Sequence, residues 1–218
     1  MAKQTVKCRN GHKAEHIVAS LADLRFPAVF NPYADRCALH DLPDAVEIRK
    51  ANLVAALSAA AGGVDELWIA LEPGHMGARR TGLAMTDDRN LPTFAARWGL
   101  ADIRRATQSG PESEQTAGII WEALAGDKRR IFLWNVFPLH CHEPSVPLSN
   151  RRHTQLEREA CHNLTEAIIN LVVPHRILAI GRDASKAMKQ AARQCIYVRH
   201  PARGGKAAFL DGAKHLQA

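Results

Sequence analysis

Four short apolar runs constrain the fold of this 218-residue chain more than any other feature. They cover residues 67–71, 131–134, 177–180 and 196–199, and they do not alternate with polar residues. Runs of this kind are typical of strands buried on both faces, as in a parallel sheet covered by helices. Helical patterns separate the runs. We therefore predict an α/β fold, a three-layer sandwich with a central, mostly parallel four-stranded sheet flanked by helices.

The expected helices and loops fill the remainder of the chain. Asp44 is a candidate N-cap, and Gly62 and Gly63 mark a helix stop. The length and the 46% hydrophobic composition suit one domain over residues 1–218, with a helical amino-terminal part at 1–62. Helices are predicted at 12–24, 44–62, 92–98, 116–124, 153–173 and 183–194, and loops at 26–42, 72–90 and 108–114.

Each apolar run leads into a residue that can do chemistry. The residues that follow are Glu72, Asn135, the pair Gly181-Arg182, and His200. In parallel α/β sheets, ligands bind at the carboxyl ends of the strands. A carboxylate, an amide, an arginine and an imidazole are therefore expected to converge on one cleft.

The net charge of +7 is concentrated near the carboxyl end of the sequence. Residues 176–218 contain nine Lys or Arg against two Asp, so the remainder of the chain is balanced. A basic end on a neutral body indicates a face that binds a polyanion. The alternative is a solvated surface that only keeps the protein soluble. We favour the polyanion because several of these charges flank the fourth run.

Three segments carry a resemblance to a known family. Glu72 precedes Pro73 after the first run, Asn135 follows the second, and His200-Pro201 follows the fourth. In this order the motifs resemble the uracil-DNA glycosylase superfamily over residues 67–206. The resemblance implies a monofunctional enzyme without metal or cofactor that hydrolyses the N-glycosidic bond of uracil in DNA and leaves an abasic site.

The resemblance also assigns roles to residues. Glu72 would stabilise the sugar cation and orient water, and His200 would donate to uracil O2 as negative charge develops there. The Asn135 amide is complementary to uracil N3–H and O4. The alternatives are a capping or surface carboxylate, a histidine satisfied at a strand end, and an asparagine that closes a turn. The other residues expected beside uracil are Leu71, Gly74, His75 and Met85.

Basic residues and glycines near the strand ends are expected to contact DNA phosphates. No leucine follows His200-Pro201 to wedge into a duplex, and Arg203 is the only large residue nearby. We therefore expect a preference for single-stranded substrate, in which base flipping costs least. The expected DNA contacts are Arg199, Arg203, Gly204, Gly205 and Lys206, with Arg79, Arg80 and Arg151; for the segment 149–152, a helix-entry turn is the alternative to a phosphate clamp.

The chain departs from the family pattern at three positions. Glu72 replaces Asp or Asn, Met85 replaces a phenylalanine that stacks on uracil, and Gly74 replaces a tyrosine that blocks thymine. Phe137 and Trp134 are alternative stacking residues. A second hypothesis is therefore a protein that binds uracil-containing or abasic DNA with little turnover. A third, an α/β hydrolase or nucleotide-binding enzyme, lacks a GxSxG elbow, a P-loop and a Rossmann glycine fingerprint.

The cysteines and apolar stretches add limits. The five cysteines are odd in number and form no CxxC pair, so we expect reduced thiols. Cys141 and Cys161 follow Asn135 as two ligands of an iron–sulfur cluster would, but the spacing of Cys8 and Cys37 is wrong, and we expect no cluster. No signal peptide or spanning segment is visible, which favours a cytoplasmic location, nucleoid-associated if the protein is bacterial. We expect a monomer, although the sequence does not fix the oligomeric state. Roles for residues 31–33 and 40–41 stay open.

Overall fold

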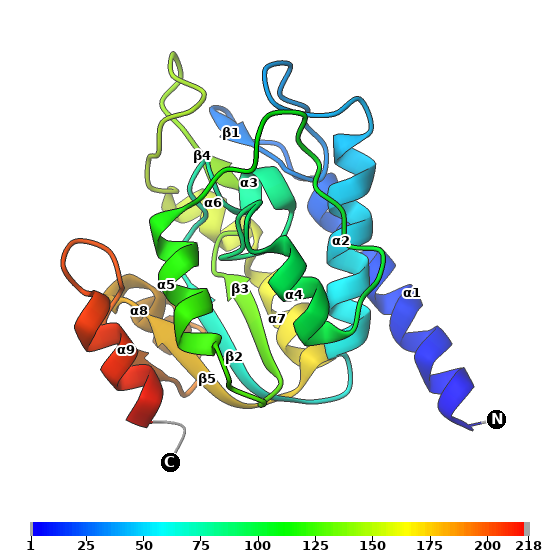
Figure 1. Ribbon diagram of the computed structural model, residues 1–218, viewed down its shortest axis with the longest axis vertical. Helices are drawn as coiled ribbons and strands as arrows, with labels where there is room; N and C mark the ends of the chain where they lie inside the picture. Colours follow the sequence, from blue (N-terminus) through cyan, green and yellow to red (C-terminus); the bar gives the residue numbers. More distant parts are fainter. Residues whose placement is uncertain (1, 216–218) are drawn as a thin grey trace.

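The computed structural model describes residues 2–215, with side chains from residue 10 onward. Its core is a four-stranded sheet in the order β3-β2-β5-β6, in which every pairing is parallel (Figure 1). The predicted α/β class and the four-stranded central sheet are confirmed. The strands are β2 (Val64–Ala70), β3 (Ile131–Asn135), β5 (Pro174–Ile180) and β6 (Ile196–Val198).

Helices cover the sheet on both sides (Figure 1). α5 and α9 pack together, and the Trp68 ring of β2 meets Phe209 of α9 edge to face at 6.0 Å between centroids. α1, α2 and α7 form a second packed group. The helices are α1 (Ala2–Ala22), α2 (Ala45–Ala60), α3 (Ala78–Thr81), α4 (Leu91–Trp98), α5 (Gln115–Leu124), α6 (Gln155–Ala160), α7 (His162–Val172), α8 (Arg182–Gln190) and α9 (Lys206–His215).

Several elements differ from the sequence prediction. The predicted helix 153–173 is two helices. α6 begins after a capping box of Thr154 and Glu157, and Cys161 separates it from α7. Asp44 occupies the N-cap position of α2 without capping, since its carboxylate forms an ion pair with Arg104. The prediction missed α3, α9 and the antiparallel pair of β1 (Val29–Phe30) and β4 (His140–Cys141).

The two segments left without a role surround a buried arginine. Arg49 of α2 is fully buried, and it donates to Asp41 Oδ2 at 2.9 Å and to the carbonyl of Pro32 at 2.6 Å. The Tyr33 hydroxyl donates to the carbonyl of Gly82 at 2.9 Å. Gly82 has φ of +73°, and a Cβ there would lie 2.8 Å from Arg49 Cβ. These residues fasten the loop before α2 to the loop after β2, which carries candidate site residues.

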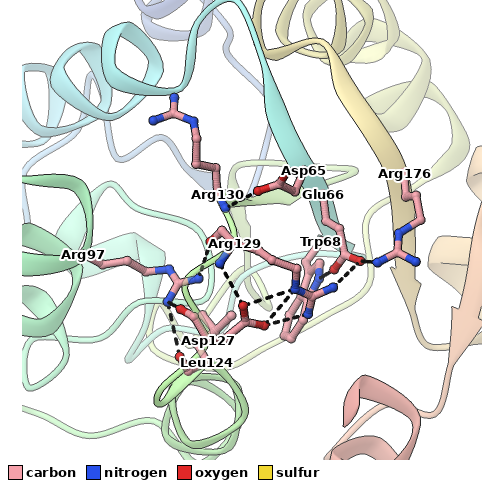
Figure 2. Close-up of polar contacts among 9 residues, drawn as sticks. All are labelled: Asp65, Glu66, Trp68, Arg97, Leu124, Asp127, Arg129, Arg130 and Arg176. Carbon is pink, nitrogen blue, oxygen red and sulfur yellow. Dashed lines mark hydrogen bonds and ion pairs between the residues drawn. The ribbon is translucent and has the colours of Figure 1, made fainter. Parts of the chain in front are cut away.

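A buried carboxylate lies toward the amino-terminal ends of the strands (Figure 2). Glu66 of β2 is 1% exposed and accepts from Arg129 Nη1 at 2.7 Å, from Arg176, and from Trp68 Nε1 at 2.7 Å. Arg129 also pairs with Asp127. The cluster ties β2 to β5 and to the segment that enters β3.

In the part of the chain with described coordinates, no helix is long and apolar enough to cross a membrane.

Replacing Glu66 with alanine is expected to lower the free energy of unfolding by about 1–3 kcal/mol, because it leaves the buried Trp68 Nε1–H without its acceptor and removes the carboxylate shared by Arg129 and Arg176. Urea denaturation followed by circular dichroism measures the change. Asp65→Ala is the matched control, since Asp65 is the neighbouring carboxylate but is only partly buried and accepts from the backbone N–H of Arg130. Equal losses in the two variants would contradict a special contribution from Glu66.

Candidate active site

Two adjoining cavities open at the carboxyl ends of the strands. The inner cavity has a volume of about 290 Å³, and the outer cavity about 630 Å³. Both include Glu72, Arg152, His200 and Arg203 in their walls. The loops after β2, β3 and β6 therefore meet, as their places at the strand ends predict. The inner cavity also contains Gly74, Met85, Glu114, Asn135 and Asn150, and the outer one Leu71, Gly181, Arg182 and Arg199.

Glu72 is held by a residue that the sequence did not single out. Its Oε2 atom accepts from the backbone N–H of His153 at 2.9 Å and from His153 Nδ1 at 2.6 Å. The His153 ring stacks on Phe137 with centroids 5.2 Å apart. The carboxylate is thus fixed through one oxygen, and Oε1 remains for water or a ligand. Only the fold shows this pair, because 81 positions separate the two residues.

His200 is oriented by its own loop. Its Nδ1 atom accepts from the backbone N–H of Ala202 at 3.1 Å, which leaves Nε2 as the protonated nitrogen of the neutral ring. Burial, together with Arg199 and Arg203, lowers the pKa of His200. The imidazole is therefore a neutral donor in the neutral pH range.

Two glycines bring the backbone close to His200. A Cβ at Gly205 would lie 2.0 Å from the carbonyl oxygen of His200, and one at Gly181 would lie 3.3 Å from its Cβ. Gly205 is buried and supports the His200 loop, and its contact with a DNA phosphate stays a prediction. Gly204 is exposed with φ of +75°.

Asn135 and Met85 complete the cavity beneath these groups. Asn135 ends β3, is 2% exposed, and pairs in register with Ala70 of β2. Among the described residues its side-chain amide makes no hydrogen bond, so it can serve a ligand. Phe137 and Trp134 are 0% and 1% exposed and are not among the residues given for the walls of either cavity, so which side chain stacks on the base stays a prediction. Met85 lies in the cavity wall.

Arg79 and Arg80 are buried and paired within the protein, although the sequence suggests exposed charge, and their contact with DNA stays a prediction. Both lie on α3, whose residues are all buried. Arg79 donates to His140 Nδ1 at 2.9 Å and lies 3.8 Å over the Phe30 ring. Arg80 pairs with Asp88 at 2.9 Å. The loop turns inward, because these guanidinium groups find internal acceptors that satisfy them.

Behind the cavity, His140 connects Arg79 to the loop that carries His75. Burial and the charge of Arg79 lower the pKa of His140 to about 3, so the ring is neutral. Its Nε2 contacts the Ser149 carbonyl at 2.9 Å and Asn150 Oδ1 at 3.1 Å. Asn150 Oδ1 also accepts from the backbone N–H of His75 at 3.1 Å. His75 is not in the described walls of either cavity, and its role stays a prediction.

The basic residues divide into neutralised and exposed groups. Arg151 is held by Glu157 through contacts of 2.7 and 3.0 Å, so the segment 149–152 is a structured helix entry. Lys206 pairs with Glu122 at 2.8 Å but is half-exposed. We name the exposed arginines around the outer cavity the basic rim, which comprises Arg152, Arg182, Arg199 and Arg203; Arg152 is exposed but forms an ion pair with Asp183.

Within the residues that the structure describes, no group of three or more His, Cys, Asp or Glu side chains is placed to hold a metal ion. The two cysteines weighed as cluster ligands, Cys141 and Cys161, are buried. Burial raises the pKa of each thiol to about 12, so both stay protonated. The Cys8 side chain lies outside the described residues.

Comparisons with known proteins bear on the fold. No protein-family model and no curated protein matches the chain. Among solved structures, the chain is similar to wild-type SMUG2 from Pedobacter heparinus, a member of the uracil-DNA glycosylase superfamily. The TM-score is 0.63 at 14% sequence identity, over 94% of this chain and 97% of that chain. The fold implied by the sequence motifs is confirmed.

Proposed function

We propose that this chain, which has the fold of the uracil-DNA glycosylase superfamily, is a monofunctional DNA glycosylase that releases uracil and leaves an abasic site. The observation that carries the proposal is the meeting of Glu72, Asn135 and His200 in one cavity. A carboxylate, an amide and an imidazole donor are the groups that this hydrolysis requires.

Breaking the N-glycosidic bond develops positive charge on the sugar and negative charge on the base. The Glu72 carboxylate stabilises the cation and orients water through Oε1, while His153 holds Oε2. No metal enters this scheme.

His200 and Asn135 contact the departing base. His200 Nε2–H donates to uracil O2, and because the donor is already oriented by Ala202, little reorganisation is needed. The Asn135 amide pairs with N3–H and O4, and such paired contacts to a base edge contribute about 1–3 kcal/mol of discrimination.

The basic rim supports DNA as the partner. Its arginines line the outer cavity, which shares Glu72 and His200 with the cavity that contains Asn135. Phosphate contacts of this kind make affinity fall with salt, because bound cations are released from the DNA. No aromatic or leucine wedge lies in residues 201–206, which supports a preference for single strands.

Alkali cleavage of a labelled oligonucleotide with one uracil tests the proposal. Strand breaks are expected after incubation with the protein, faster from a single strand than from a duplex, and absent when cytosine replaces uracil in a matched oligonucleotide, because the cytosine edge does not match the Asn135 amide. No cleavage of either form would contradict the activity, and tight retention without product would favour the binding hypothesis. Equal or faster cleavage of the duplex would contradict the strand preference alone.

A further inference from the structure

Glu114 is a carboxyl group in the cavity that no motif indicates. It is the N-cap residue of α5, but its side chain makes no capping hydrogen bond. Instead it lies in the wall of the inner cavity, together with Asn135 and Asn150. A residue at this position ordinarily binds the first N–H groups of its helix. The carboxyl of Glu114 is therefore placed for something other than helix capping.

Two glycines after Glu72 make room for this carboxyl. A Cβ at Gly77 would lie 2.1 Å from Glu114 Oε2, and a Cβ at Gly74 would lie 3.0 Å from Oε1. Side chains at positions 74 and 77 would thus compete with Glu114 for the same space. The Glu114 carboxyl therefore occupies the space beside Gly74 and Gly77, which have no side chains.

The surroundings of Glu114 favour its protonated form. Burial and the nearby Asp87 carboxylate raise the pKa of Glu114 to about 7. Asp87 is fixed there, because its Oδ2 accepts from the backbone N–H of Glu114 at 2.7 Å. A protonated carboxyl has an O–H donor that a carboxylate lacks. The other charged or titratable groups in the walls of the inner cavity are Glu72, Arg151, Arg152, His200 and Arg203.

We propose that Glu114 is a specificity-determining residue whose protonated carboxyl donates a hydrogen bond to an exocyclic oxygen of the extruded base. This inference rests on the proposed function and adds the chemical class that the cavity selects. Deaminated bases carry an oxygen where the parent base carries an amino group, and an O–H donor matches the oxygen but not the amino group. The ionised carboxylate only accepts hydrogen bonds, and it repels the negative charge that develops on the departing base.

The sign of the pH dependence follows from this assignment. Below a pH of about 7 Glu114 carries its proton and the donor is present, and above it the donor is lost. Uracil release is therefore expected to fall by about tenfold between pH 6 and pH 8. The pKa of His200 is lowered, and its Nε2–H is present in both the charged and the neutral ring, so titration of this histidine does not remove a donor as the pH rises.

Single-turnover rates on a single-stranded uracil oligonucleotide between pH 5.5 and 9 test the proposal. Glu114→Gln is expected to remove the fall above pH 7, because an amide N–H donates at every pH. Glu112→Gln is the matched control, since Glu112 is an exposed carboxyl two positions earlier, and it should keep the wild-type profile. Glu114→Ala should show at pH 6 a rate close to that of the wild type at pH 8.

Two results would overturn the inference while leaving the proposed function intact: a fall above pH 7 that persists in Glu114→Gln, or wild-type rates at every pH in Glu114→Ala. If Glu114→Gln does not fold, the profile of Glu114→Ala decides alone. If the wild-type protein releases no uracil at any pH, the proposed function itself fails. The outcome for the activity is thus separable from the outcome for Glu114.

Discussion

Replacement of Glu72 by glutamine is expected to slow uracil release by about 10²–10⁴-fold, the range that a positioned acid–base group contributes. The variant keeps an oxygen that can accept from both donors of His153 at 2.9 and 2.6 Å, so the loop is expected to keep its place. What it loses is the negative charge that stabilises the sugar cation and attracts a water proton. Single-turnover cleavage of a uracil oligonucleotide measures the effect.

The control for this substitution is binding. Affinity for the same DNA should stay within a few-fold of wild type, because the hydrogen bonds that the structure shows for Glu72 go to His153 and not to an arginine of the basic rim. His153→Ala should give a smaller loss than Glu72→Gln, since it removes the support but leaves the carboxylate. A Glu72→Gln protein that cleaves at the wild-type rate would show that the reaction does not use this carboxylate.

Replacement of His200 by alanine is expected to lower the rate of uracil release by about 10²–10³-fold, as for other preorganised donors to a developing anion. The backbone N–H of Ala202 fixes the ring so that Nε2–H is the available donor. Because the neutral ring is the donor, the loss should be the same at pH 6.5 and pH 8. The measurement is again single-turnover release.

A second substitution separates the ring from the loop that carries it. Gly205→Ala places a Cβ against the His200 carbonyl, so it should displace the loop and reduce the rate although the imidazole is present. Arg199→Ala, on the exposed rim, should affect DNA affinity more than the chemical step. If His200→Ala cleaved as fast as Arg199→Ala at saturating DNA, the assigned role would be wrong.

The sheet and the ends of its strands were predictable from sequence because their signal is local. Unbroken apolar runs identify buried parallel strands, and parallel strands place their following residues at one edge. For this reason the sequence was enough to predict that Glu72, Asn135 and His200 lie at one cavity. Short, weakly hydrophobic elements such as β1, β4 and α9 have no comparable local pattern.

The surroundings of other candidate residues depend on contacts between distant segments, which the sequence does not show. Arg79 and Arg80 look like surface charge in the sequence, but His140 and Asp88 provide internal acceptors for them. Glu114, which lies in the cavity wall, and His153, which binds Glu72, come from the starts of helices and not from strand ends. Nothing close to either residue in the sequence pairs it with Glu72 or with Gly77.

The bond between Glu72 and His153 also has a consequence for synthesis of the protein on the ribosome. A nascent chain that has reached residue 150 contains Glu72 and Asn135, but it lacks both His153, which binds the Glu72 carboxylate, and His200. His153 is synthesised with the segment before α6, and His200 is synthesised later, with the turn after β6. Under the proposed function, glycosidic cleavage therefore requires a polypeptide elongated past position 200, and shorter translation products would meet DNA without the means to damage it.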